Sequence, residues 1–223
     1  MSMSLLDLRE SVLENVVRDD LSSNRLDRYI NAAIQRIARY HNWRDLYVKA
    51  TADTESGQGE YALPLGEDKI KDLISMTLID GDSSAFKLDA VPYRRLHELV
   101  PHPSSTTTGR PKFYTVWDDV VQLFPVPDGV YTLEILYVKW PVKLEAVDDT
   151  PDLVGLDDAI VAGSTFQCFL SLQQKEDASF WNEQFNLLIR ESIEGDVKHT
   201  DHALRLQGYR TAPTREPSQD QPI

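Results

Sequence analysis

Apolar residues recur at helical spacing near the start of the chain. Within residues 23–41 they follow one another at intervals of three and four, which predicts a helix with one buried stripe: Leu26, Ile30, Ala33, Ile34 and Ile37. We expect another helix before it, over residues 5–18. Trp43 follows the end of the helix at 23–41, where we expect its side chain to cover the core. The chain is therefore predicted to open with a helical pair.

The same spacing returns near the end of the chain. One helix is predicted over residues 158–173, with Asp157 as its N-terminal cap. A second is predicted over residues 177–195, where a glycine is expected to end it. Beyond Asp196 the periodicity is lost and prolines accumulate, so we expect a tail that orders only when it binds a partner.

Strand patterns fill the middle of the chain. Residues 131–137 alternate, which predicts a strand with one buried face: Tyr131, Leu133, Ile135 and Tyr137. The β-branched and aromatic runs at 113–117 and 120–124 are expected to precede it as a hairpin folded at Asp118-Asp119. The three strands are predicted to form a meander. No catalytic residue type stands out along it, which favours a structural role.

Two further hairpins are predicted before the meander. The first joins a strand at 46–51 to one at 60–64 through the glycine-containing turn at 56–59. The second joins a strand at 70–80 to a return strand at 86–88. The middle of the chain is thus expected to be an antiparallel β region.

The order of these elements predicts an α+β protein rather than an alternating one. We assign residues 1–45 and 152–195 to a helical bundle, and residues 46–151 to a central, inserted antiparallel β domain. Residues 196–223 are assigned to an extended C-terminal tail.

Composition is consistent with a folded soluble protein. The 223 residues are 41% hydrophobic, and no run approaches the roughly 20 apolar residues of a membrane helix. Acidic residues occupy the start of the chain, where a signal peptide would carry basic ones. We expect synthesis in the cytoplasm and no membrane partner.

The net charge of -13 argues against a protein that grips nucleic acid by neutralising phosphates. Two interpretations of this acidity remain open. It serves solubility, or it lines a channel wall past which DNA moves without adhering.

The sequence offers no catalytic, cofactor or metal site. Its histidines lack zinc-site spacing, and His199 and His202, three residues apart, have no obvious third ligand. Paired aspartates fall where turns and caps favour them. Cys168 stands among apolar neighbours, which indicates a buried side chain. There is no nucleophile elbow and no phosphate-binding glycine loop.

Several motifs, taken in order, carry a family resemblance. They are a helical pair ending near a tryptophan (34–43), Tyr-x-Leu-Pro (61–64), Gly-x-Pro-x-x-Tyr (109–114), Leu-Phe-Pro-x-Pro-Asp (123–128), Tyr-x-x-x-Pro (137–141) and a final helical pair. Over residues 20–195 this order resembles that of tailed-bacteriophage head-to-tail adaptor proteins. Each motif alone is an ordinary turn or strand signal.

The resemblance implies a structural virion protein at the junction of capsid and tail. Adaptors of this kind form a ring of about twelve copies beneath the portal protein. It further implies a downstream tail or nozzle protein as the next partner, and DNA that passes through the channel without sequence-specific binding. It implies no enzymatic activity and no cofactor.

In such a ring the C-terminal segment would reach the portal. The tail carries apolar, aromatic and arginine side chains of the kind that anchor a segment ordering on binding: Leu204, Arg205, Leu206, Tyr209 and Arg210. We predict these residues as the portal-binding site.

Three alternatives remain open. Another tail-ring component, a stopper or a terminator, would be expected to be mostly β. A tail-associated cell-wall hydrolase would need two carboxylates placed across a glycosidic bond. A soluble binding module of unrelated origin is opposed only by the family pattern.

Overall fold

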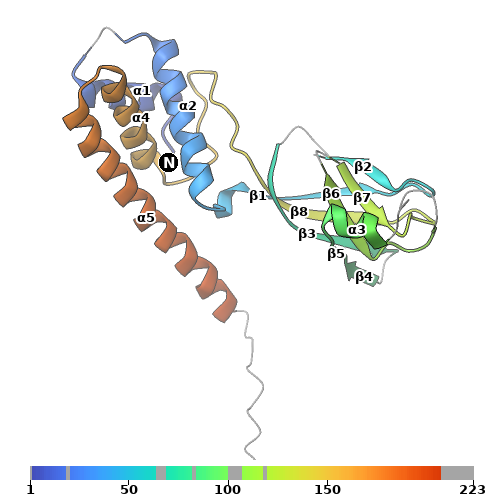
Figure 1. Ribbon diagram of the computed structural model, residues 1–223. Coiled ribbons are helices and arrows are strands. Elements are labelled where there is room, and N and C mark those ends of the chain that lie inside the picture. Colours follow the sequence, from blue (N-terminus) through green and yellow to red (C-terminus); the bar gives the residue numbers. More distant parts are fainter. Residues whose placement is uncertain are drawn as a thin grey trace, which may run out of the picture.

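The computed structural model describes most of the chain, in six stretches: residues 2–18, 21–63, 69–81, 84–99, 107–117 and 120–206. Figure 1 shows a helical bundle built from both ends of the chain and, beside it, a β domain built from the middle. The fold is therefore α+β, with N- and C-terminal helices flanking the central strands, as predicted.

The bundle has a central helix. Its members are α1 (Leu5–Val16), α2 (Ser23–Tyr40), α4 (Asp157–Ser171) and α5 (Lys175–Leu206). Helix α4 contacts each of the other three. The predicted stripe on α2 is buried, with every member at most 2% exposed. Trp43 covers the core just beyond α2, as expected, and its Nε1 donates to the Ile37 carbonyl at 3.0 Å.

A glycine in α4 allows close packing of three helices. A Cβ atom at Gly163 would lie 2.9 Å from Cδ2 of Phe185 in α5 and 3.1 Å from Cβ of Ala33 in α2. Phe185 is fully buried. The approach of α5 to α4 and α2 therefore depends on the absence of a side chain at position 163.

The start of α4 differs from the prediction. Asp157 is the first helical residue rather than the cap, and Leu156 occupies the N-cap position. The Asp157 carboxylate instead accepts hydrogen bonds from Ser2 Oγ at 3.1 Å and from the Met3 backbone N–H at 3.2 Å. An aspartate is favoured by the helix dipole throughout the first turn, so the residue type alone does not distinguish a cap from its neighbour.

Helix α5 is longer than predicted. It passes through Gly195, where we expected it to end, and continues to Leu206. A glycine inside a helix costs only about 1 kcal/mol relative to alanine, and nothing lies within 4 Å of a Cβ built at Gly195. The first part of the segment expected to be extended, residues 196–206, is consequently helical.

The β domain consists of two four-stranded sheets. The first has the antiparallel order β1 (Tyr47–Asp53), β8 (Thr132–Lys139), β3 (Ile70–Asp80) and β4 (Ser84–Lys87). The second has the order β2 (Glu60–Ala62), β7 (Val120–Phe124), β6 (Phe113–Trp117) and β5 (Asp89–Ala90), in which β5 and β6 are parallel. Apolar side chains of both sheets form a second core, and the short helix α3 (Tyr93–Leu99) contacts β6.

Two predicted hairpins are confirmed, and the other strand pairings are corrected. β3 pairs with β4 and β6 pairs with β7; Asp118 and Asp119, predicted as the turn of the latter, lie outside the described residues. β1 and β2 do not form a hairpin, and β8 is not the third strand of a meander, because each joins a different sheet from its expected neighbour.

The alternation predicted for β8 is correct. Leu133, Ile135 and Tyr137 are buried between the sheets, although the strand pairs with β1 and β3 rather than with β7. An alternating pattern identifies the buried face of a strand and not the strand beside it.

The β domain leaves and re-enters the bundle at one place. Tyr47 at the start of β1 lies opposite Val138 near the end of β8. Leu46 and Val138 are both buried in the core of the bundle. The Nζ of Lys71 in β3 also donates to two backbone carbonyls at the C-terminal end of α2. The two parts of the molecule therefore share a continuous junction.

Candidate assembly surfaces

Helix α5 extends beyond the bundle at its C-terminal end (Figure 1). Of the predicted portal-binding residues, Leu204, Arg205 and Leu206 form the end of this helix. Tyr209 and Arg210 lie outside the described residues. The structure thus brings the first three to the tip of a projecting helix, and their role in binding stays a prediction.

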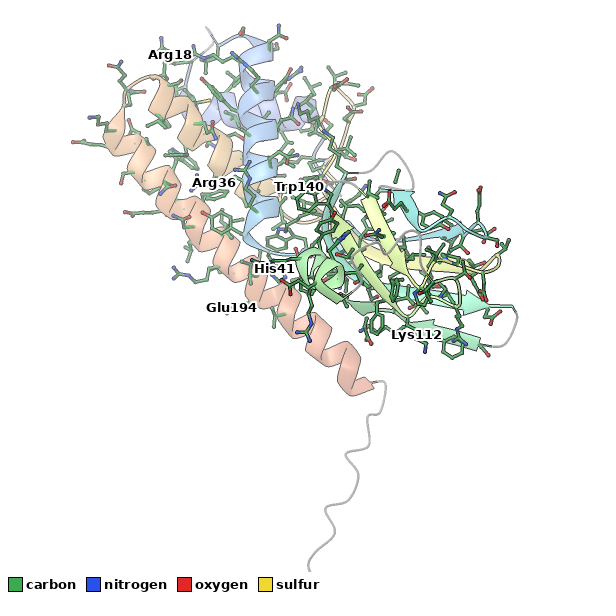
Figure 2. All side chains as sticks on the ribbon, turned by 45° about the vertical axis from the view of Figure 1, so that its right-hand side comes forward. Arg18, Arg36, His41, Lys112, Trp140 and Glu194 are labelled. Atoms are coloured by element: carbon green, nitrogen blue, oxygen red, sulfur yellow. The ribbon has the colours of Figure 1, made fainter. Side chains whose placement is uncertain are left out.

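An arginine of α2 holds α5 against the bundle. The guanidinium carbon of Arg36 lies 4.4 Å from the ring centroid of Phe185 and 5.4 Å from that of Phe166. Arg36 Nη2 also donates to Asn182 Oδ1 at 3.1 Å. Figure 2 shows Arg36 between α2 and α5. Its charge is used inside the bundle, where a cation over aromatic faces is stabilising.

A second contact fixes α5 near the place where it leaves the bundle. Nε2 of His41, just past α2, lies 2.9 Å from Oδ2 of Asp196. The His41 ring packs edge-on against Trp43, with 5.2 Å between ring centroids. The direction of the projecting part of α5 is therefore set by side chains at the end of α2.

The face of α5 opposite the core combines acidic and large apolar side chains. We call this face the α5 stripe; its exposed acidic and apolar members recur at intervals of three and four residues: Glu176, Phe180, Glu183, Leu187, Glu191 and Glu194. One exposed cation, Arg190, lies on the same face, three residues after Leu187. Phe180 is 54% exposed and Leu187 46%. The buried positions of the same helix, Ala178, Phe185 and Ile189, lie on another face. A partner for the stripe would need basic and apolar groups together.

A cleft of opposite charge lies between the bundle and the β domain. It has a volume of about 600 Å³ and is lined by Gln35 and Arg39 of α2, by Lys69, and by residues 140–143. A hollow of about 290 Å³ adjoins it, shares Gln35 and Lys143, and extends it toward Arg28. We call the two together the basic groove. Figure 2 shows Trp140 at this junction.

Backbone and amide hydrogen bonds shape the basic groove. The backbone N–H of Trp140 donates to the Lys69 carbonyl at 2.8 Å. The side-chain amide of Gln35 donates to the Pro141 carbonyl at 3.0 Å. The chain between β8 and the helices is thereby held against α2, so that the groove is preformed.

Within the described ranges, no three or more His, Cys, Asp or Glu side chains gather as metal binding requires. Cys168 is buried, as predicted, and burial raises the pKa of its thiol to about 11. No helix in the described part of the chain is long and apolar enough to cross a membrane.

Sequence reasoning missed Arg36 and the basic groove. The signal for Arg36 was its place on α2 beside the apolar stripe, which is an unusual position for a solvated charge. The groove gave no local signal, because its basic residues come from three separate segments, around positions 28–39, 69 and 143.

These features define a class: an α+β protein with a projecting helix and two surfaces of opposite charge, typical of a structural component that assembles with other chains. A family model described as SU10 adaptor protein matches residues 3–212, which is nearly the whole chain. The chain belongs to this family, and the resemblance to phage head-to-tail adaptors is confirmed. No curated protein matches it.

Membership gives the coarse function. The chain is a phage structural adaptor protein, of a family that is non-enzymatic and implies a virion component at the head-tail junction with portal and tail proteins as partners. The matched range reaches past Arg210 and so contains every predicted portal-binding residue.

Proposed function

We propose that copies of this chain form a closed ring between the portal protein and the next tail component, and that the ring is a conduit for DNA. The family match over residues 3–212 carries this proposal. Subunits of a cyclic ring use two different surfaces in a head-to-tail contact, and rings of about twelve copies are expected for adaptors. This chain offers two unlike surfaces, the α5 stripe on its helical bundle and the basic groove between the bundle and the β domain.

The C-terminal end of the chain is proposed to bind the portal. Helix α5 carries Leu204, Arg205 and Leu206 at its tip, and Tyr209 and Arg210 follow in the sequence. Leucine side chains provide buried apolar area, while tyrosine and arginine are the side chains most enriched among energetically dominant interface contacts. We propose that these five residues together anchor the chain on the portal, at the end of a helix that is fixed to the bundle.

The acidic body is proposed to let DNA pass. With a net charge of -13 per copy, a ring repels the phosphate backbone instead of binding it. Such repulsion opposes adhesion of the duplex to the channel wall and carries no sequence preference.

The experiment is electron microscopy of the native particle, or of the purified chain mixed with the portal encoded beside it. We expect a closed ring, coaxial with the portal, whose C-terminal segments contact the portal. A ring that lies further down the tail, without a portal contact, would instead indicate a stopper or terminator. A stable monomer at high concentration that binds no portal would contradict the proposal.

Variants test the portal contact separately. Alanine at Leu204, Leu206 and Tyr209 together is expected to weaken portal binding by at least about tenfold, because each removes a side chain of the proposed anchor. The matched control is alanine at Leu170, an exposed leucine of α4 that belongs to neither the α5 stripe nor the basic groove. Equal portal binding by the triple variant and the wild type would exclude the tail as the portal site.

A further inference from the structure

The basic groove concentrates positive charge on a strongly acidic chain. Arg28 and Arg39 lie on the same exposed face of α2, and Lys69 and Lys143 flank them from two other segments. Within the described stretches, no carboxylate forms an ion pair with any of the four. One acid, Asp27, also lines the groove beside Arg28, and it is already paired with Arg9 by two hydrogen bonds, of 2.6 and 2.8 Å.

The groove also offers apolar surface. Trp140 forms part of its wall, and Val142 beside it is 57% exposed. A concave site that combines cations with a wall of one partly buried aromatic and one exposed aliphatic side chain fits a segment that alternates carboxylates with large apolar side chains. A simple anion would leave the apolar wall unused.

The α5 stripe has this composition. Phe180 and Leu187 alternate along it with Glu176, Glu183 and Glu191. Within the described part of the chain these three glutamates form no ion pair. Their charges are therefore available to a partner.

The α5 stripe is longer than the basic face of α2. Arg28 and Arg39 are eleven residues apart on α2, and the stripe extends from Glu176 to Glu194 on α5. At about 1.5 Å of rise per residue, the basic face spans about 16 Å and the stripe about 27 Å. A helix laid in the groove would thus present its acidic and apolar side chains over the whole length of the basic face.

The two surfaces involve different helices of one copy, and each lies on the side of its helix opposite the buried residues. Helix α4 contacts both α2 and α5. On α2, the groove residues lie on the side opposite the buried residues Leu26 to Ile37. One copy can therefore use its stripe and its groove at the same time, toward two different neighbours. Such a contact is heterologous, which is the type that generates rings.

We propose that the α5 stripe of one copy docks in the basic groove of the next copy around the ring. This inference rests on the proposed ring and names the surfaces that close it. A second copy is the favoured occupant because the same chain supplies both halves of the contact in equal number and with complementary charge, and because the stripe is long enough to cover the basic face. If the test fails, the alternative occupants of the groove are duplex DNA and an acidic segment of another protein.

The test uses charge reversal in the full chain. The groove variant carries Arg39→Glu and Lys143→Glu, and the stripe variant carries Glu183→Lys and Glu191→Lys. Each alone places like charges across the contact, so we expect ring formation with the portal to need at least about tenfold more protein. Ring formation is followed by sedimentation and by electron microscopy, and folding by circular dichroism.

Mixing the two variants makes the test specific. In an equimolar mixture, the acidic groove of one variant faces the basic stripe of the other, and the unchanged surfaces pair as in the wild type. We expect the mixture to form rings at nearly wild-type concentration, with the two variants alternating. Arg95→Glu, an exposed charge reversal on α3 of the β domain, is the matched control and is expected to leave ring formation unchanged.

The outcomes separate this inference from the proposed function. Normal rings from each variant alone would overturn the inference and leave the ring intact. Loss of rings without rescue in the mixture would assign the groove to another occupant. If the wild type binds duplex DNA and the groove variant does not, that occupant is DNA. Failure of the wild type to form a ring with its portal would overturn the proposed function itself.

Discussion

Two helical glycines allow the packing of the bundle to be measured. Gly163 in α4 is crowded, since a Cβ there would lie 2.9 and 3.0 Å from two ring atoms of Phe185. Gly195 in α5 is open, with nothing within 4 Å of its Cβ position. Neither glycine has a positive φ. Alanine therefore fits the backbone at both positions, and only the surroundings differ.

The two substitutions to alanine are expected to change the free energy of unfolding in opposite directions. Each gains about 0.5–1 kcal/mol from the lower helix propensity of glycine. At Gly163 the added methyl must displace the fully buried ring of Phe185, and overpacking of a core costs about 1–3 kcal/mol. Gly195→Ala should thus raise the free energy of unfolding, while Gly163→Ala should lie about 1–3 kcal/mol below it.

Urea unfolding followed by circular dichroism provides the measurement, with both variants and the wild type in the same buffer. The difference between the two alanine variants isolates the packing cost, because the propensity gain is common to both. If Gly163→Ala proved as stabilising as Gly195→Ala, the close approach of α5 to α4 would not be what fixes the bundle.

Three further results are expected. Arg36→Met should lower the free energy of unfolding by about 1–2 kcal/mol, because it removes the cation over Phe185 while it keeps an apolar stem; urea unfolding checks this. Cys168 should resist alkylation at pH 8 in the native protein and react fully in denaturant, since a pKa of about 11 leaves roughly a thousandth of the thiol ionised and burial blocks access; mass spectrometry after iodoacetamide checks this. Hydrogen bonds lower the pKa of Asp7, chiefly from the Ser4 side chain, and that of Asp149, from two backbone N–H groups. Their contribution to stability should be complete above the ordinary value of 3.8 and be lost as the pH falls through the lowered pKa values; unfolding measured against pH checks this, and Asp149→Asn should flatten the profile.

Local periodicity predicted the helices well, because the spacing of apolar residues reports directly on a buried face. The stripe from Leu26 to Ile37 and the alternation from Leu133 to Tyr137 were both correct in their buried side. The partner strands of β8 were not predictable in this way, since the same alternating face serves any sheet that covers it. Gly195 led us to predict the end of α5 too early, because a single glycine costs a helix too little free energy to end it.

The candidate surfaces differ in the same way: one is local in sequence, and the other is assembled by the fold. The predicted portal-binding residues are contiguous in sequence, so composition alone drew attention to Leu204 and its neighbours. The groove was invisible because Arg39, Lys69 and Lys143 meet only after the chain has traversed the whole β domain. The net charge of -13 describes the whole chain and therefore gave no sign of the basic groove, which is a local site.

The pairing of Tyr47 with Val138 has a consequence for how such a protein diversifies. Both ends of the β domain meet side by side at the bundle, so the domain is an insertion whose termini already coincide. Its turns and outer strands can lengthen, shorten or be exchanged for another module without moving any helix of the bundle. In the proposed ring, the bundle can accordingly keep its contacts with identical neighbours through evolution while the β domain adapts to whatever lies next to it.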